Sequence, residues 1–353
     1  MARIIGKGFS FDDVLIIPKY NKVPSRKDVI FKTRVTRNYF IDMPLIAANM
    51  DTVCESKMAI AIGKLGGLGV LHRFMSIEEQ VEEVRKVKEV GLLCSAAIGI
   101  KDYEERIPPL IRAGVDILVL DVAHGHSKRV GKVLDWFKIN FPNNDPSKRK
   151  IDIMVGNVAT KDAAEYFISK GADAIKVGIG PGSMCTTRIM TGAGVPQLTA
   201  IMDAYEATQK RIPVCADGGI RRPGDVVKAL GAGADTVMLG SVFSGAEETP
   251  GEVIERNGKK FKKYRGMASY GAAMKKMQID GKKHEEIINV EGEVTEVEFK
   301  GPIEPIVKKY LGGLASGMTY MGVDTIDKLS GKSDFIEISH SGWKESIAHG
   351  LGE

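Results

Sequence analysis

A repeat of short apolar runs constrains the fold of this chain more than any other feature. Eight such runs recur, and a helix-like polar stretch separates each run from the next. The first and last begin at Leu45 and Thr236, 191 residues apart, which is about 27 per interval and close to the ~31 residues per unit of an eight-unit barrel. Continuously apolar runs are typical of parallel strands buried on both faces. The runs are Leu45–Ala48, Leu68–His72, Leu92–Ile98, Ile117–Asp121, Ile153–Gly156, Ala174–Gly178, Pro213–Ala216 and Thr236–Gly240.

A short motif in front of three runs indicates that the units are equivalent. Ala-Gly-Val-Asp occupies positions 113–116, and Gly-Ala-Asp occurs at 171–173 and again at 233–235. Glycine can adopt the left-handed conformation that ends a helix, so the motif predicts the same helix-to-strand turn three times. We therefore predict a single domain over residues 1–353 with the (β/α)8 TIM barrel fold, in preference to a doubly wound sheet. Its active site would lie at the carboxyl ends of the strands.

Two segments do not fit the repeat. Residues 1–40 precede the first run, and residues 248–301 form a mostly charged, glycine-punctuated excursion before a helical stretch at Pro305–Leu314. Connections of this length are uncommon in compact domains, and many of them are active-site lids. The alternative for 248–301 is a flexible surface insertion.

Composition narrows the function classes. The net charge of +5 is spread along the chain, and no basic segment is interleaved with aromatic residues, so we expect no nucleic-acid partner. No apolar stretch approaches the ~20 residues of a membrane span, and there is no signal peptide, so we expect a cytoplasmic protein without a membrane partner. Four widely spaced cysteines without metal-ligand spacing predict free thiols; they are Cys54, Cys94, Cys185 and Cys215.

The loop after the sixth run is a candidate catalytic loop. Residues 178–188 contain three glycines and a proline, which shape the backbone around Cys185. Cys185 lies past the carboxyl end of a predicted strand among polar residues, where a thiol can be partly exposed. A free thiol has a pKa of about 8.5, so a nucleophile there needs neighbours that favour the thiolate. The alternative is a buried structural cysteine.

The seventh and eighth runs end in small residues that suit an anion. Asp217-Gly218-Gly219-Ile220 and Gly240-Ser241 allow backbone N–H groups to reach a phosphate, as the corresponding loops of barrels commonly do. The carboxylate of Asp217 suits a ribose diol, and its alternative role is helix capping. His124 and His126 follow the fourth run, but no third ligand is near, so we expect no metal there. From the residues alone, we predict a barrel that holds a phosphorylated ribose near a cysteine.

Taken together, five motifs resemble the IMP dehydrogenase/GMP reductase family over roughly residues 8–330. They are Asn49–Val53, Gly180–Arg188, Asp217–Ile220, Val237–Ser241 and Tyr264–Ser269. The resemblance implies a TIM barrel whose cysteine attacks C2 of a purine nucleotide monophosphate, and a homotetramer. It also implies a mobile flap at 264–301 that carries Glu291 over the purine.

The resemblance assigns roles residue by residue. Cys185 would be the nucleophile, with Thr187 and Glu291 relaying the leaving proton. Substrate would be bound by Met50, Ser183, Asp217, Gly219, Gly240, Ser241, Tyr264, Met267 and Ala268. Asp121 and Asn157 would lie on the side of the nicotinamide cofactor. The backbone carbonyls of Gly180, Gly182 and Cys185 resemble a monovalent-cation site, which would hold K⁺.

The choice between the two branches of the family rests on a few details. The chain runs through Lys86–Val90, where dehydrogenases usually carry inserted regulatory modules. The stretch 277–286 also lacks the Arg-Tyr pair with which dehydrogenases hydrolyse the covalent intermediate, and residues 46–51 and 251–260 look like reductases. Residues 71–80 and 121–127, in contrast, look like dehydrogenases.

We therefore predict the reductase branch, with reductive deamination of GMP to IMP and ammonia by NADPH through a covalent thioimidate on Cys185. The alternative is the dehydrogenase branch without regulatory modules, which oxidises IMP to XMP with NAD. An alternative from another class is a barrel that binds a nucleotide or flavin phosphate without this chemistry.

Overall fold

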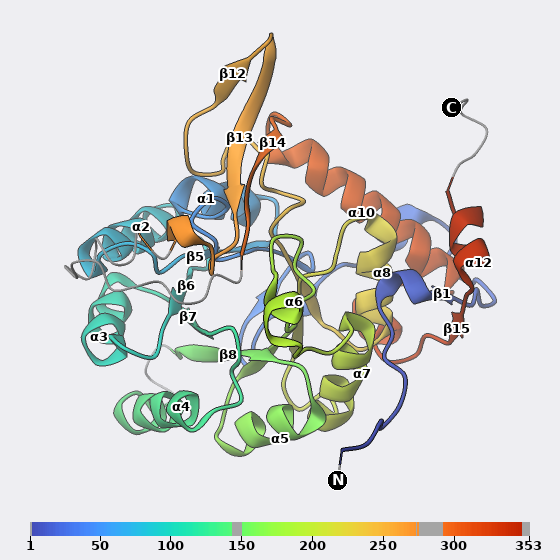
Figure 1. Ribbon diagram of the computed structural model, residues 1–353, viewed down its shortest axis with the longest axis horizontal. Helices are drawn as coiled ribbons and strands as arrows, with labels where there is room; N and C mark the ends of the chain where they lie inside the picture. Colours follow the sequence, from blue (N-terminus) through green and yellow to red (C-terminus); the bar gives the residue numbers. More distant parts are fainter. Residues whose placement is uncertain (1, 143–149, 273, 275–291, 348–353) are drawn as a thin grey trace.

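The computed structural model describes residues 2–142, 150–272, 274 and 292–347. Eight parallel strands close into a barrel in the order β10-β11-β4-β5-β6-β7-β8-β9, which confirms the predicted TIM barrel (Figure 1). Each strand coincides with one of the eight apolar runs to within a few residues. The strands are β4 (Leu45–Ala47), β5 (Leu68–Leu71), β6 (Ser95–Ile98), β7 (Ile117–Asp121), β8 (Asp152–Val158), β9 (Ala174–Val177), β10 (Val214–Asp217) and β11 (Thr236–Leu239).

Helices surround the barrel and bury its outer face. Helix α2 continues without interruption through Lys86 and ends at Glu89, so no domain is inserted there. The long excursion separates the helix of the eighth unit, α10, from its strand in the sequence. Helix α10 packs on α8 (Figure 1). The helices after successive strands are α1 (Ser56–Lys64), α2 (Ile77–Glu89), α3 (Tyr103–Ala113), α4 (Lys128–Asn140), α5 (Lys161–Ser169), α6 (Thr187–Thr191) with α7 (Gln197–Thr208), α8 (Pro223–Gly231) and α10 (Ile303–Tyr320).

The repeated glycine-aspartate motif has one structural role in all three copies. Its glycines have φ values of +106°, +81° and +119°, so each ends a helix in the left-handed conformation as predicted. Each aspartate accepts a hydrogen bond from a backbone N–H near the start of the preceding barrel strand. The pairs are Asp116 with Cys94 (2.9 Å), Asp173 with Ile153 (3.1 Å) and Asp235 with Val214 (2.8 Å).

The excursion at 248–301 contains a three-stranded antiparallel sheet, which sequence analysis did not predict. Strands β12 (Ile254–Arg256), β13 (Lys259–Arg265) and β14 (Val294–Glu298) form a projection from the barrel (Figure 1). Lys262 ties the sheet to the barrel, because its buried ammonium donates to the carbonyls of Thr249 at 2.6 Å and Glu247 at 3.3 Å. The two ends of the predicted flap therefore belong to this sheet. Residues 275–291 lie outside the described part of the chain.

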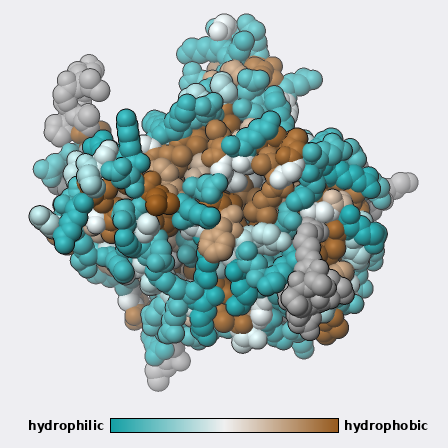
Figure 2. All heavy atoms as spheres, turned by 180° about the vertical axis from the view of Figure 1, so that it is seen from behind, coloured by the Kyte–Doolittle hydropathy of each residue, from teal (hydrophilic) through white to brown (hydrophobic). Residues whose placement is uncertain are grey.

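The remaining elements pack around the barrel. Strand β1 (Val14–Ile16) pairs antiparallel with β15 (Phe335–Glu337), which brings an early and a late segment of the chain side by side, and β2 (Thr33–Arg34) pairs with β3 (Phe40–Ile41). The face opposite to that of Figure 1 is mostly hydrophilic, with apolar residues gathered below the projection (Figure 2). Among the described residues, no helix is both long and apolar enough to cross a membrane. The shorter helices are η1 (Phe11–Asp13), η2 (Arg26–Asp28), α11 (Ile326–Leu329) and α12 (His340–Glu345).

Candidate active site

One cavity of about 550 Å³ gathers every predicted site residue that the structure describes. Volumes of this size are typical of small-molecule sites. Glu291 lies outside the described residues. Those in the cavity wall are Met50, Asp121, Asn157, Gly180, Gly182, Ser183, Cys185, Thr187, Asp217, Gly219, Gly240, Ser241, Tyr264, Met267 and Ala268.

Cys185 differs from the other three cysteines in its exposure. It lies between β9 and α6 and is partly exposed, whereas Cys54, Cys94 and Cys215 are buried. Burial raises the pKa of the Cys215 thiol to about 12, which makes that thiol a poor nucleophile. The Cys185 thiol lies 3.1 Å from Oγ1 of Thr187 and donates to it. In the thiolate form the same geometry lets the threonine hydroxyl donate to sulfur.

The cysteine loop is held by both ends of the predicted flap. The backbone N–H of Glu293 donates to the carbonyl of Met184 at 3.1 Å, and the N–H of Gly266 donates to the carbonyl of Glu293 at 2.9 Å. Cys185 and Gly292 form an isolated antiparallel bridge. The residue that follows Glu291 in the sequence is therefore paired with the candidate nucleophile.

Tyr264 joins the predicted phosphate side to the predicted base side. Its buried hydroxyl lies 3.4 Å from Oγ of Ser183 and donates to Sδ of Met50 at 3.9 Å. Burial raises the pKa of Tyr264, so the phenol stays neutral and can donate a hydrogen bond to an anion. Gly240 allows this close packing, since a Cβ there would lie 2.9 Å from the Met50 sulfur and 3.0 Å from the Tyr264 oxygen.

Lys176 is a cavity residue that sequence analysis missed. It is the one charged residue within β9, and its ammonium lies 2.7 Å from Oδ1 of Asp121 and 2.6 Å from Oδ2 of Asp217. Burial alone would lower the pKa of Lys176, but the two carboxylates outweigh it and raise the pKa above its ordinary value. Burial would raise the pKa of Asp121, but Lys176 and Arg73 hold it below its usual range. A lysine inside an apolar run was the sequence signal for this group.

Asn157 and Asp217 are bonded to each other and to this lysine. Both donors of the Asn157 amide are used, one by the carbonyl of Gly178 at 2.7 Å and one by Oδ2 of Asp217 at 2.9 Å, and its oxygen accepts from Lys176. Asn157 is thus committed to orienting its neighbours. The helix-capping alternative for Asp217 is wrong, because it ends β10 and α8 begins only at Pro223.

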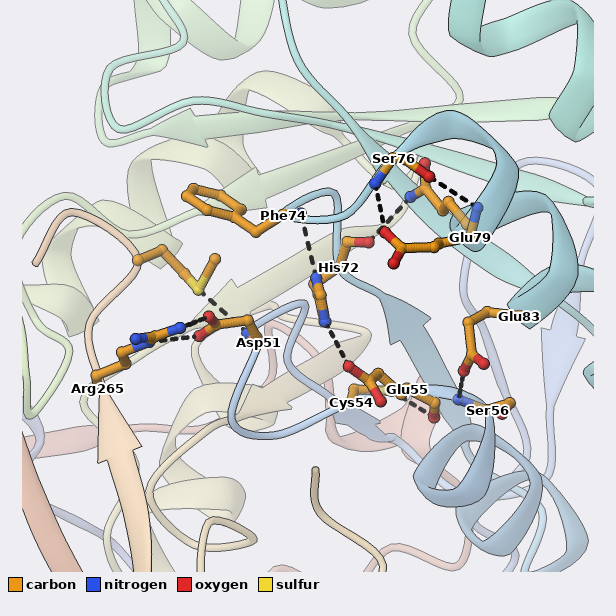
Figure 3. A network of polar contacts seen from close by, with 12 residues as sticks. Asp51, Cys54, Glu55, Ser56, His72, Phe74, Ser76, Glu79, Glu83 and Arg265 are labelled. Atoms are coloured by element: carbon orange, nitrogen blue, oxygen red, sulfur yellow. Dashed lines mark hydrogen bonds and ion pairs between the residues drawn. The ribbon is translucent and has the colours of Figure 1, made fainter. Parts of the chain in front are cut away.

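Sequence analysis also missed the role of the ion pair between Asp51 and Arg265 (Figure 3). Arg265 ends β13, and Nε of its guanidinium lies 3.1 and 3.0 Å from the two carboxylate oxygens of Asp51. The backbone N–H of Asp51 donates to Sδ of Met267 at 3.3 Å. Met267, a predicted base-binding residue, is therefore held against the residue that follows Met50, the other predicted base-binding methionine.

His72 belongs to a polar network next to the cavity wall (Figure 3). It is fully buried, and its Nδ1 accepts from the backbone N–H of Phe74 at 3.1 Å. Nε2 therefore carries the proton and donates to Glu55 Oε1 at 3.0 Å. Phe74 and the neighbouring Arg73 line the cavity, so this network fixes the wall next to Asp121.

The predicted cation site gives a mixed picture. Carbonyl oxygens suit hard cations, but the Gly182 carbonyl already accepts from the N–H of Cys185 at 3.1 Å. Nε of Arg188 donates to the carbonyl of Ile179 at 3.1 Å, and its side chain packs over Gly180. The guanidinium thus places a positive charge beside Gly180, and the K⁺ site stays a prediction.

A family profile described as IMP dehydrogenase / GMP reductase domain matches residues 8–349. The chain belongs to this family. Members with either name are similar to it over nearly their whole length. The IMP dehydrogenases of Borreliella burgdorferi and Cryptosporidium parvum are each 41% identical to it, and the matches cover 98% and 99% of this chain and 98% and 96% of theirs. The GMP reductase of Leishmania donovani is 33% identical, and the match covers 98% of both chains.

The family fold also matches a solved structure. A GMP reductase variant from Trypanosoma brucei, in complex with guanosine 5′-monophosphate, superimposes with a TM-score of 0.91 at 32% identity. The match covers 99% of both chains. The family is an oxidoreductase family of purine metabolism, and the two names describe two different reactions.

Proposed function

We propose that this family member is a GMP reductase, which converts GMP to IMP and ammonia with NADPH. The observation that carries the choice of branch is the sequence 277–286, which contains neither arginine nor tyrosine. The family resemblance assigns to that stretch the Arg-Tyr pair with which dehydrogenases activate water. A reductase must keep water away from its covalent intermediate, so the missing pair fits reduction. The related Trypanosoma brucei structure, which contains GMP, supports the same substrate.

The residues of the cavity account for the chemical steps. The Cys185 thiolate forms a bond to C2 of the purine, and the C2–N bond to the exocyclic amino group then breaks. Thr187 lies in hydrogen-bond contact with the sulfur and passes a proton to the leaving ammonia. A bound nicotinamide cofactor would supply a hydride for C2. Cys185 would then leave C2 as the thiolate, which restores the nucleophile. Glu291 is the proposed partner of Thr187 in this relay.

The cavity wall divides into three subsites for the nucleotide. Ser183, Tyr264 and the backbone at Gly219, Gly240 and Ser241 would hold the 5′-phosphate. Asp217 would bind the ribose hydroxyls, and Met50, Met267 and Ala268 would enclose the base. Asp121, whose low pKa keeps it ionised, would face the nicotinamide side. A cytoplasmic location stays a prediction of the sequence composition, and a homotetramer stays a prediction of the family resemblance.

A two-mixture assay tests the proposal. Purified protein receives either GMP with NADPH or IMP with NAD⁺, and the absorbance of the reduced nicotinamide is followed. We expect loss of absorbance in the first mixture and no change in the second. Gain of absorbance only in the second mixture would overturn the proposal.

IMP dehydrogenase is the second candidate, because the relatives with 41% identity carry that name. In that reaction His284 or a neighbouring lysine would have to activate water in place of the missing arginine. Replacing Lys282, Lys283 and His284 together by Ala tests this alternative. The triple variant should abolish XMP formation in a dehydrogenase, whereas the proton relay proposed for the reductase includes none of the three.

A further inference from the structure

Lys176 connects two sides of the cavity that belong to different ligands. The side chain, 2% exposed, rises from β9 between Asp121 at the end of β7 and Asp217 at the end of β10. Its Nζ lies 2.7 and 2.6 Å from one oxygen of each carboxylate, and it also donates to Oδ1 of Asn157 on β8. One ammonium thus holds side chains from three neighbouring strands.

The charges around Lys176 require it to stay protonated. The charged and titratable groups that face it are Asp121, Asp217 and the buried thiol of Cys215, and Arg73 lies beyond Asp121. Without the ammonium, two carboxylates would share one largely buried site. Leaving buried charges unpaired in this way is strongly unfavourable.

The hydrogen bonds of Asp217 show how Lys176 orients this carboxylate in the cavity. Oδ2 of Asp217 accepts from Lys176 at 2.6 Å and from Nδ2 of Asn157 at 2.9 Å. In the part of the chain that the structure describes, Oδ1 of Asp217 makes no hydrogen bond. The carboxylate is therefore fixed by one oxygen, and the other oxygen is available to the cavity.

We infer that Lys176 is the positioning residue that turns Asp217 toward the ribose hydroxyls of the nucleotide and couples this subsite to Asp121. The inference rests on the proposed function, because it deepens the account of the same nucleotide site. It predicts that recognition of the ribose, rather than of phosphate or base, depends on Lys176. Lys176 itself need not touch the substrate.

The test compares two nucleotides that differ only in the ribose hydroxyls. Binding of GMP and of 2′,3′-dideoxyguanosine 5′-monophosphate is measured by calorimetry for wild type and for Lys176→Met. The preference for GMP should fall roughly 10- to 100-fold in the variant, the effect of one lost hydrogen bond to a charged group. An unchanged preference would overturn the inference, whether the two affinities keep their wild-type values or fall by the same factor.

The pH dependence of that preference is a readout that a merely structural role would not change. In Lys176→Met two carboxylates share one largely buried site without a positive partner, so a proton is taken up there more readily as the pH falls. The preference for GMP should therefore increase between pH 6 and pH 8. In wild type it should stay constant there. Both nucleotides carry the same phosphate, so titration of the phosphate cancels in the ratio. A pH-independent preference in the variant would contradict the coupling.

Two further variants keep the test decisive. Lys138→Met removes a lysine that pairs with the buried Asp173 at 2.7 Å at the opposite end of the barrel, so it controls for lost stability without touching the site. Lys176→Arg keeps the charge and should retain most of the ribose preference even if Lys176→Met does not fold.

Ribose-dependent binding together with turnover of IMP but not GMP would reject the proposed function and leave the inference standing. Turnover of GMP with an unchanged ribose preference in Lys176→Met would reject the inference and leave the proposed function standing.

Discussion

The guanidinium of Arg265 binds the fully buried carboxylate of Asp51 and so joins the end of β13 to the loop after β4. The two residues are 214 positions apart in the sequence. Beside this pair, Met267 accepts from the backbone N–H of Asp51, and Tyr264 contacts Met50. The projecting sheet is thus anchored where the purine base is proposed to bind.

Replacing Arg265 by Met should therefore raise KM for the nucleotide roughly 10- to 100-fold, because the two methionines lose their fixed spacing. It should also lower the free energy of unfolding by about 3 kcal/mol, since Asp51 is left as an unpaired buried charge. Steady-state kinetics and urea unfolding measure the two effects.

Arg256→Met is the matched control. Arg256 lies on the same sheet and pairs with Glu296 at 3.2 Å, but it is largely exposed. An exposed pair contributes about 0.5 kcal/mol, so stability and KM should hardly change. Equal effects of the two arginine variants would show that the sheet as a whole matters and the buried pair does not.

Iodoacetamide should label one cysteine. Cys185 is partly exposed, while burial raises the pKa of Cys54 well above its ordinary value and that of Cys215 to about 12. Mass spectrometry of the labelled, folded protein should show a single carbamidomethyl group on Cys185, and saturating GMP should slow its formation. Labelling of a buried cysteine at the same rate would contradict the described burial.

Cys185→Ala should abolish turnover and leave nucleotide binding largely intact, because the cavity keeps its phosphate and ribose groups. Calorimetry with GMP measures the second part. Cys94→Ala is the control, since that buried thiol lies outside the cavity and its loss should affect stability alone. Substantial turnover by Cys185→Ala would refute covalent catalysis.

Sequence periodicity predicted the barrel well because local hydrophobicity determines which residues are buried in a parallel sheet. It could not predict the network around Lys176, since Asp217, which pairs with it, lies 41 positions away. A single lysine in an apolar strand indicates that some partner exists, but only the closed barrel shows which.

The projecting sheet was missed for a different physical reason. In β13 the buried residues Lys262 and Tyr264 flank the exposed Lys263, so burial there follows the period of a strand while hydrophobicity does not. The buried ammonium of Lys262 is compensated by backbone carbonyls of residues 246–249. Every residue has a backbone carbonyl, so the sequence does not indicate which ones accept from Lys262.

The stability of the barrel should depend on pH through Asp235. Burial raises the pKa of this carboxyl from 3.8 to about 6 in the folded state, although the N–H of Val214 and the charges of Arg34 and Lys210 oppose the rise. The folded state therefore binds the proton more tightly than the unfolded state, and this contribution to stability is present below pH 4 and lost as the pH rises through 6.

Asp235→Asn should remove this dependence, because the amide oxygen still accepts from Val214 but carries no charge. At pH 7.5 the variant should be more stable than wild type by about 1–2 kcal/mol, and at pH 4 the two should be equal. Urea unfolding across this pH range measures the difference. A difference that does not change with pH would contradict the raised pKa.

The last prediction separates two glycines by what surrounds them. A Cβ at Gly240 would meet the Met50 sulfur at 2.9 Å and the Tyr264 oxygen at 3.0 Å, whereas nothing lies within 4 Å of a Cβ at Gly312 in α10. Gly240→Ala should thus displace the phosphate and base subsites and weaken GMP binding by about tenfold or more. Gly312→Ala should leave binding unchanged and stabilise the exposed helix by about 0.5–1 kcal/mol, because alanine loses less backbone entropy on folding. If Gly240→Ala bound GMP as tightly as wild type, the contact of Met50 with Tyr264 would not belong to the nucleotide site.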